Sequence, residues 1–367
     1  MRKLEKFNDI SKDSSWNITY SYKYDLASFC NLFTKSEQLI ELHEEGYDDF
    51  KEVIEAKPEF IELAQNMQKG GFDPRIVLVS AFDQIDHDGA DIEKLCSVLE
   101  EPGKKEKLRD YYVHKKELVT EETWNNNLAP LLPTLAQMAR YIHENGFQEY
   151  WEKKYSPLLE RRVKEIESNV LEYNIIDEIN KLLGQKHKLQ FDQISLQLSC
   201  FSAPFGTKLK NQSFLTDTRW ELKDIILIAL HEMIHPPFSR DKIEEIAEFV
   251  WDDDLIQEAY EKQPSSSSYN TPVRFLEEHL TEAAHIYLGE KLGMVESPLI
   301  YFAEHDNGSH VVSVVVYDFL KKNWGEESES LEAIIDKMVE EKILYPNKIR
   351  DEYLRIYKEA NIKPPFN

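Results

Sequence analysis

Residues 218–237 read TRWELKDIILIALHEMIHPP, and they predict one buried helix with a defined start and end. Thr218 is a candidate N-cap, and Glu221 stands three residues later, as in a capping box. The run Ile225–Leu230 is apolar nearly all round, which is typical of a helix buried on every side. The two prolines that close the stretch cannot continue a helix, so we expect it to end just after His235.

The end of this helix carries the motif H-E-x-x-H, formed by His231, Glu232 and His235. Residues four apart share one face of a helix, so both imidazoles can reach a single metal ion. Between them, Glu232 can act as a general base on a water bound to that metal. The motif therefore predicts a Zn²⁺ site and zinc-dependent hydrolysis, with a peptide bond as the expected target. The alternative interpretation is an ordinary buried helix whose two histidines are hydrogen bonded.

A second helix is expected to supply the third ligand, because catalytic zinc usually takes three protein ligands and a water. The stretch 271–285 begins with a threonine that can cap a helix and a proline suited to its first turn. Spacings of four and three place Glu278, Glu282 and His285 on one stripe of this helix. A polar stripe of this kind, on a helix that packs near the first one, is what a metal site requires.

The two neighbours of Glu278 are alternative ligands. Glu277 precedes it and offers the same carboxylate, so the two glutamates compete for the role. His279 follows it and points about 100° away around the helix. We favour Glu278 as the third ligand because of its position on the polar stripe, and Glu277 stays an alternative ligand.

Together the two stretches resemble the gluzincins, the metallopeptidase group that includes thermolysin and the M1 aminopeptidases. Residues 276–282 read LEEHLTE and are similar to the M1 pattern L-N-E-G-F-A-E. The resemblance implies that Glu278 is the third zinc ligand, that Glu282 orients a ligand histidine, and that the catalytic domain is zincin-like. It covers roughly residues 190–320. A glutamate stands where M1 enzymes have asparagine, and 42 residues separate His235 from Glu278, about twice the usual gap.

Hydrolysis at zinc also needs a donor for the oxyanion, and such enzymes usually supply a Tyr or a His beside the metal. His310 and Tyr317 lie seven residues apart, two turns along one face of an expected helix. Some zinc oligopeptidases have a His and a Tyr at a similar spacing after their glutamate ligand. We therefore predict that His310 or Tyr317 donates to the oxyanion. In the alternative, Tyr317 belongs to the core and His310 to the surface.

Residues 193–200 alternate between apolar and polar side chains, which predicts a strand just before the metal-binding helix. The chain then turns, and residues 211–215 are expected to return as a second strand. An edge strand here could bind a peptide substrate by β-augmentation, whereas an ordinary hairpin explains the same residues.

The rest of the chain is mainly helical in pattern, so we predict a mainly helical α+β fold with a small sheet next to the H-E-x-x-H helix. We expect a mostly helical N-terminal domain over residues 1–185 and a zincin-like metallopeptidase domain over residues 186–367. The long gap between the ligand stretches reads as two inserted helices, over residues 241–250 and 254–262.

Composition narrows the class of partner. The chain has 367 residues and a net charge of −24, which argues against nucleic acid and anionic membranes as partners. Its three cysteines, Cys30, Cys96 and Cys200, suggest no disulfide framework. Neither a signal peptide nor a membrane-spanning run is recognisable, so a cytoplasmic location is expected. We predict a peptide or protein substrate. The alternative function is a catalytically silent zinc-binding protein of zincin fold that acts in protein–protein interaction.

Overall fold

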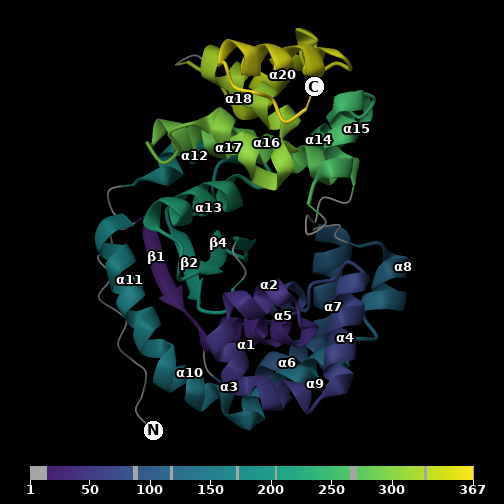
Figure 1. Ribbon diagram of the computed structural model, residues 1–367, viewed down its shortest axis with the longest axis vertical. Helices are drawn as coiled ribbons and strands as arrows, with labels where there is room; N and C mark the ends of the chain where they lie inside the picture. The colour runs from purple at the N-terminus through teal and green to yellow at the C-terminus, as the bar shows by residue number, and fades with distance from the viewer. Residues whose placement is uncertain are drawn as a thin grey trace. The chain divides into compact units, whose positions relative to one another are not determined.

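The computed structural model describes residues 15–85, 90–115, 119–170, 173–202, 205–264, 271–325 and 329–366. The protein is mainly helical with one small mixed sheet of four strands, which confirms the predicted α+β class (Figure 1). Over the described ranges, each helix is either too short or too polar to cross a lipid bilayer.

The chain divides into two compact units. The first, here called the sheet unit, consists of residues 1–171 and 194–220, and the second, the helical unit, of residues 172–193 and 221–367. This division differs from the expected boundary at 185/186, which assigned the strands to the metal-binding domain. The physical reason is strand pairing, because the strand at 194–199 is hydrogen bonded to the strand at 16–20.

The sheet has the strand order β1-β2-β4-β3. Its strands are β1 (Trp16–Tyr20), β2 (Ile194–Ser199), β3 (Thr207–Lys208) and β4 (Ser213–Asp217). The first two pairings are parallel, with Leu196 opposite both Ile18 and Phe214, and the β3–β4 pairing is antiparallel.

The predicted strand at 193–200 is confirmed as β2, and it is a central strand rather than the edge strand that β-augmentation would need. Both of its sides are occupied, by β1 and by β4, so its backbone groups are already paired. A peptide therefore cannot be added along β2. β2 and β4 do not form the hairpin that was the alternative, because they run parallel to each other. Along the chain, β3 comes between them and pairs antiparallel with β4.

The other elements of the sheet unit are helices. They are α1 (Tyr22–Phe29), α2 (Glu37–Leu42), α3 (Glu44–Glu55), α4 (Pro58–Lys69), α5 (Pro74–Asp83), α6 (Ile92–Glu100), α7 (Pro102–Arg109), α8 (Glu121–Thr123), α9 (Leu132–Ile142), α10 (Gln148–Lys154) and α11 (Ser156–Val170). Aromatic rings form much of the core between them. The ring of Phe29 lies 4.3 Å from that of Phe147 and 5.0 Å from that of Phe201, measured between centroids.

A buried carboxylate joins α1 to the end of β2. Asp25 Oδ1 accepts hydrogen bonds from Ser199 Oγ at 2.6 Å and from the backbone amides of Cys200 and Phe201 at 2.8 and 3.3 Å. Its Oδ2 accepts from Trp151 Nε1 at 2.6 Å. Complete burial raises the pKa of Asp25 to about 6, although the four hydrogen bonds act in the opposite direction.

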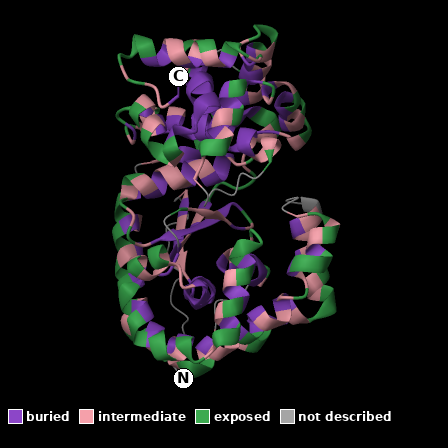
Figure 2. Ribbon diagram, turned by 45° about the vertical axis from the view of Figure 1, so that its right-hand side comes forward, coloured by how far each residue is buried: buried purple, intermediate pink, exposed green. Residues whose placement is uncertain are grey.

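The helical unit is built around α16 (Pro272–Lys291), which packs against α13, α14, α17 and α18. Its other helices are α12 (Ile175–His187), α13 (Leu222–Ile234), α14 (Arg240–Val250), α15 (Asp254–Lys262), α17 (Pro298–Glu304), α18 (Val311–Asn323), α19 (Leu331–Glu340) and α20 (Lys348–Glu359). Every residue of α18 from Val311 to Leu320 except Asp318 is buried (Figure 2). The two helices predicted inside the long gap are confirmed as α14 and α15.

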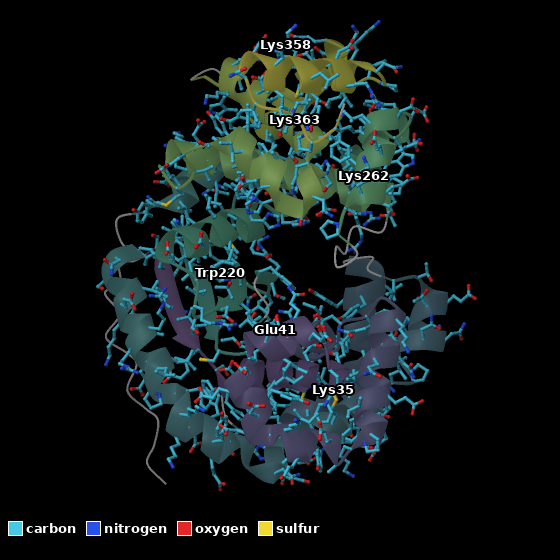
Figure 3. The ribbon with its side chains drawn as sticks, viewed as in Figure 1. Lys35, Glu41, Trp220, Lys262, Lys358 and Lys363 are labelled. Carbon is cyan, nitrogen blue, oxygen red and sulfur yellow. The ribbon has the colours of Figure 1, made fainter. Side chains whose placement is uncertain are left out.

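The end of the chain is held against α15. Lys262 donates to Glu258 at 2.6 Å and places its ammonium 4.9 Å from the centre of the Phe366 ring (Figure 3). The backbone carbonyl of Lys262 also accepts a hydrogen bond from Asn307. These contacts fix α15 to two other segments of the helical unit.

Helix α13, which carries the H-E-x-x-H motif, ends close to where the sequence predicts and begins later. It stops at Ile234, with an extended backbone at His235 before the two prolines. Its N-cap is Glu221, so the expected capping box at Thr218 is wrong. The carbonyls of Thr218 and Trp220 accept hydrogen bonds from Arg162, which keeps these residues in the turn after β4.

The raised pKa of Asp25 predicts how the stability of the sheet unit varies with pH. Its folded pKa of about 6 exceeds the ordinary value of 3.8, so its stabilising contribution is full below pH 4 and is lost as pH rises through 6. The difference corresponds to about 3 kcal/mol. The destabilisation caused by Asp25→Asn should therefore shrink between pH 4 and pH 7, as measured by denaturant unfolding.

The control for this measurement is Asp241→Asn, which removes a carboxylate from an exposed position on α14. If the hydrogen bonds instead keep Asp25 ionised at pH 4, the destabilisation by Asp25→Asn would be constant or would grow with pH. That outcome would contradict the prediction.

Candidate metal centre

The predicted metal ligands come from two helices of the helical unit that pack against each other. His231 lies in the last turn of α13, His235 caps its end, and Glu278 lies on α16. The helices approach closely at Gly289, where an added Cβ would lie 2.6 Å from Leu227 Cδ2. A larger residue at this point would press on the Leu227 side chain of α13.

Glu278 bridges the two histidines of the motif. Its Oε1 lies 3.2 Å from His231 Nε2, and its Oε2 lies 3.2 Å from His235 Nε2. One ligand atom from each of the three residues lies within 4.8 Å of the others. Two imidazole nitrogens and one carboxylate oxygen gathered within this distance are a donor set that zinc takes in proteins.

Glu277 contacts the edge of the His235 ring that faces away from Glu278. Its Oε1 lies 2.8 Å from His235 Nδ1, the ring nitrogen that does not face Glu278. A carboxylate in this place accepts the Nδ1 proton and fixes the tautomer in which Nε2 is free to bind a metal. The geometry therefore favours Glu278 as ligand and gives Glu277 a positioning role that the sequence did not reveal.

Glu282 lies beside the other motif histidine. Its Oε2 is 3.4 Å from His231 Nδ1 and 3.2 Å from His285 Nδ1. The resemblance implied that Glu282 orients a ligand histidine, and the structure places it next to His231. The Tyr301 hydroxyl also interacts with Glu282, a contact that sequence reasoning missed.

Glu232, the expected general base, is buried on α13 between the two histidines. Its charge acts on the neighbouring His231 ring and helps to raise the pKa of that imidazole. Its carboxylate is therefore within electrostatic range of His231, one of the three predicted ligands.

The histidines and carboxylates of this cluster shift one another's pKa values. Burial lowers the pKa of His231 and His235, but the surrounding carboxylates outweigh it and raise the pKa values to about 9 and about 10. Burial raises the pKa of Glu278, but both histidines outweigh it and lower the value to about 2. At neutral pH the ring nitrogens of His231 and His235 that would bind a cation therefore carry protons.

His279, the rival ligand, faces another part of the unit. Its ring lies 3.9 Å from that of Phe275 and 5.3 Å from that of His310, between centroids. Burial and the neighbouring His310 lower the pKa of His279 well below its ordinary value. Its position against Phe275 and His310, outside the two groups of close ligand atoms, disfavours it as a ligand.

The two expected oxyanion donors differ in position. Tyr317 donates its hydroxyl proton to Glu290 at 2.7 Å, twelve residues or about 18 Å of helix beyond Glu278, which places it away from the predicted ligands. His310 is buried, contrary to the alternative that put it on the surface, and pairs with Asp306 at 3.3 Å. His310 also lies within electrostatic range of Glu278 and stays a prediction.

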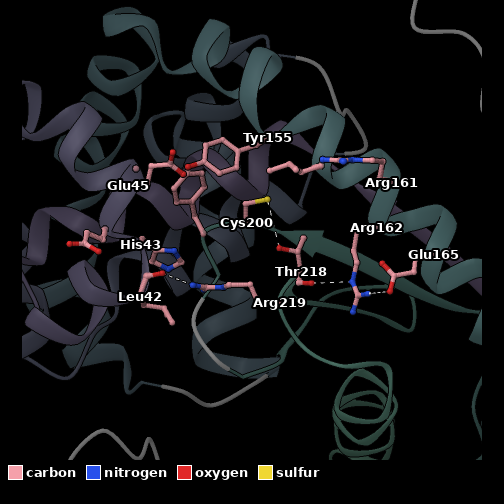
Figure 4. A pocket seen from close by; sticks show the side chains of 14 residues that line it. Leu42, His43, Glu45, Tyr155, Arg161, Arg162, Glu165, Cys200, Thr218 and Arg219 are labelled. Carbon is pink, nitrogen blue, oxygen red and sulfur yellow. Dashed lines mark hydrogen bonds and ion pairs between the residues drawn. The ribbon is translucent and has the colours of Figure 1, made fainter.

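The sheet unit has a pocket of about 570 Å³ that none of the predicted site residues lines (Figure 4). Arg162 and Arg219 reach into it, but both guanidinium groups already bind protein groups. Arg162 donates to the carbonyl of Thr218 and pairs with Glu165, and Arg219 pairs with Asp217. These two arginines are therefore engaged in internal contacts, and we assign no function to the pocket.

Comparisons of the chain with known protein families, with curated proteins and with solved structures found no match. The geometry of α13 and α16 is consequently the basis on which a function can be assigned.

Proposed function

We propose that the protein is a zinc-dependent peptide hydrolase of the gluzincin type, in which His231, His235 and Glu278 bind Zn²⁺. The observation that carries the proposal is the placement of Glu278, whose two oxygens each lie 3.2 Å from one motif histidine. Two imidazoles and one carboxylate leave a fourth position open, as in catalytic rather than structural zinc sites.

Each residue of the site has a separate role in the proposed hydrolysis. Zinc bound there would polarise a peptide carbonyl and lower the pKa of a water molecule. Glu232 takes a proton from the attacking water and passes it to the leaving amine. Glu277 and Glu282 orient His235 and His231 through the ring nitrogens that face away from Glu278.

The zincin-like nature of the fold is part of the same proposal. The two helices that carry the motif and the glutamate support it, together with the carboxylate four residues after Glu278. The substrate that this chemistry requires is a peptide or a protein.

Removal of a ligand should weaken zinc binding more than removal of an orienting carboxylate. Loss of an orienting partner typically costs 10–100-fold in affinity, so we expect that range for Glu277→Gln and a larger loss for Glu278→Gln. Competition of the purified protein with a chromophoric chelator measures both. The control is Glu261→Gln, at an exposed position on α15. Equal affinity of the Glu278→Gln and control proteins would refute the ligand assignment.

Glu232→Gln separates metal binding from turnover. The amide has the same size but cannot take a proton, so the variant should retain zinc and lose roughly 100- to 10,000-fold in kcat. The measurement is cleavage of a mixed fluorogenic peptide library by the zinc-loaded native and variant proteins. A native protein that binds zinc but cleaves no peptide would support the silent zinc-binding alternative instead.

The affinity for zinc should rise steeply with pH in the neutral range. Because the pKa values of His231 and His235 are raised to about 9 and about 10, both rings are protonated at pH 7 and metal binding must displace two protons. Affinity should therefore increase roughly 100-fold from pH 7 to pH 8. Histidines with an ordinary pKa of about 6.5 would give a nearly constant affinity over this interval. Calorimetric titration in buffers of different ionisation enthalpy counts the protons released.

A further inference from the structure

His231 faces two groups of potential ligands, one at each of its ring nitrogens. Its Nε2 lies against Glu278, as described above, and its Nδ1 lies 3.4 Å from Glu282 Oε2 and 3.4 Å from His285 Nδ1. Glu282 Oε2 and His285 Nδ1 are 3.2 Å apart. The side chains of Glu282 and His285 are both more than nine-tenths buried. His231, Glu282 and His285 thus form a second compact triad.

Hydrogen bonding alone explains this triad poorly. Sides of 3.2, 3.4 and 3.4 Å make a nearly equilateral triangle, so the two ring nitrogens subtend an angle of about 60° at the single oxygen. Lone-pair directions on a carboxylate oxygen are about 120° apart, so two donors at 60° cannot both be well aligned. Two N–H groups in these positions would also bring their hydrogens toward each other.

A divalent cation fits the same triangle. Ligand atoms at about 2.0–2.1 Å from a tetrahedral centre are separated by about 3.3 Å, which all three sides match within 0.1 Å. Two imidazole nitrogens and one carboxylate oxygen are donors that suit Zn²⁺ and Co²⁺. The cation would take the place of the proton that His231 otherwise shares with Glu282.

The charge around His231 also favours a second cation. Four carboxylates, those of Glu232, Glu277, Glu278 and Glu282, lie close to the motif histidines. In a largely buried cluster, four carboxylates hold more negative charge than one divalent ion carries, which favours a second cation.

We propose that a second divalent transition-metal ion binds to His231 Nδ1, Glu282 and His285, with the His231 imidazole bridging it to the first site. The bridging ring loses both of its N–H protons, which pass to solvent as the two ions bind. Because His231 is shared, the inference rests on the proposed function, but the second triad has two ligands of its own. The second ion, rather than Glu282, would then contact His231 Nδ1 and orient the ring that binds the catalytic ion.

The test is the metal content of the full-length protein, measured by elemental mass spectrometry after equilibrium dialysis against Zn²⁺ or Co²⁺. We expect two ions per chain in the native protein and one in His285→Ala, which keeps His231, His235 and Glu278. His285→Gln serves as a second variant that preserves the volume of the buried side chain. His187→Ala, which removes a histidine on α12 that pairs with Glu332, is the control and should keep two ions.

Binding of copper(II) in place of zinc allows the proposed His231 bridge to be tested by electron paramagnetic resonance. Two copper ions joined by an imidazolate couple antiferromagnetically, so the electron paramagnetic resonance signal of the native protein should be strongly reduced. His285→Ala should show the full signal of one isolated ion, and so should His235→Ala.

The possible results separate this inference from the proposed function. One ion in the native protein that His285→Ala and His285→Gln retain would overturn the second site and leave the proposed function standing. One ion that is lost in the His285 variants but kept in His235→Ala would support the second triad and overturn the proposed ligand set. A native protein that binds no divalent ion would overturn both.

Discussion

The contact between α13 and α16 is the constraint on which the candidate site depends. It brings imidazoles from the end of one helix against carboxylates from the middle of the other, in an environment where neither can remain charged alone. Apolar residues of α13 are buried in the helical unit, and the Leu227 side chain packs beside Gly289 of α16. The register of this packing determines which carboxylate meets which ring nitrogen.

The same constraint explains the electrostatics of the cluster. Histidines that were merely buried would have lowered pKa values, as His279 does beside Phe275 and His310. His231 and His235 are half-buried, and their pKa values are raised because carboxylates surround them. On the same pair of helices, the histidines beside carboxylates therefore have raised pKa values and the one beside Phe275 and His310 has a lowered pKa. A cluster of this kind attracts cations, whether protons or metal ions.

Local patterns predicted the parts of the site that depend on helical periodicity. The four-residue spacing of His231 and His235 and the stripe of Glu278, Glu282 and His285 follow from 3.6 residues per turn, and the structure brings them together. The choice between Glu277 and Glu278 depends instead on how α16 is rotated toward α13. That rotation is a tertiary property, so sequence spacing left both glutamates open.

The errors in the fold have a similar origin. The strand at 194–199 was recognisable from its alternation, but its central place in the sheet comes from pairing with Trp16–Tyr20, which lies far away in sequence. Thr218 resembled a helix cap, and only the distant Arg162, which binds its carbonyl, shows why the chain is still in a turn there. Each error involves a partner that the local pattern could not identify.

The long gap between the motif and Glu278 is the main departure from the gluzincin pattern, and its described residues are mostly helical. The intervening chain forms α14 and α15, and these helices pack against α16 and α18 within the same unit. A gap that folds into helices beside the site does not alter the distance between α13 and α16, because their own packing sets that distance. Loop length therefore constrains such a site less than the register of its two helices does.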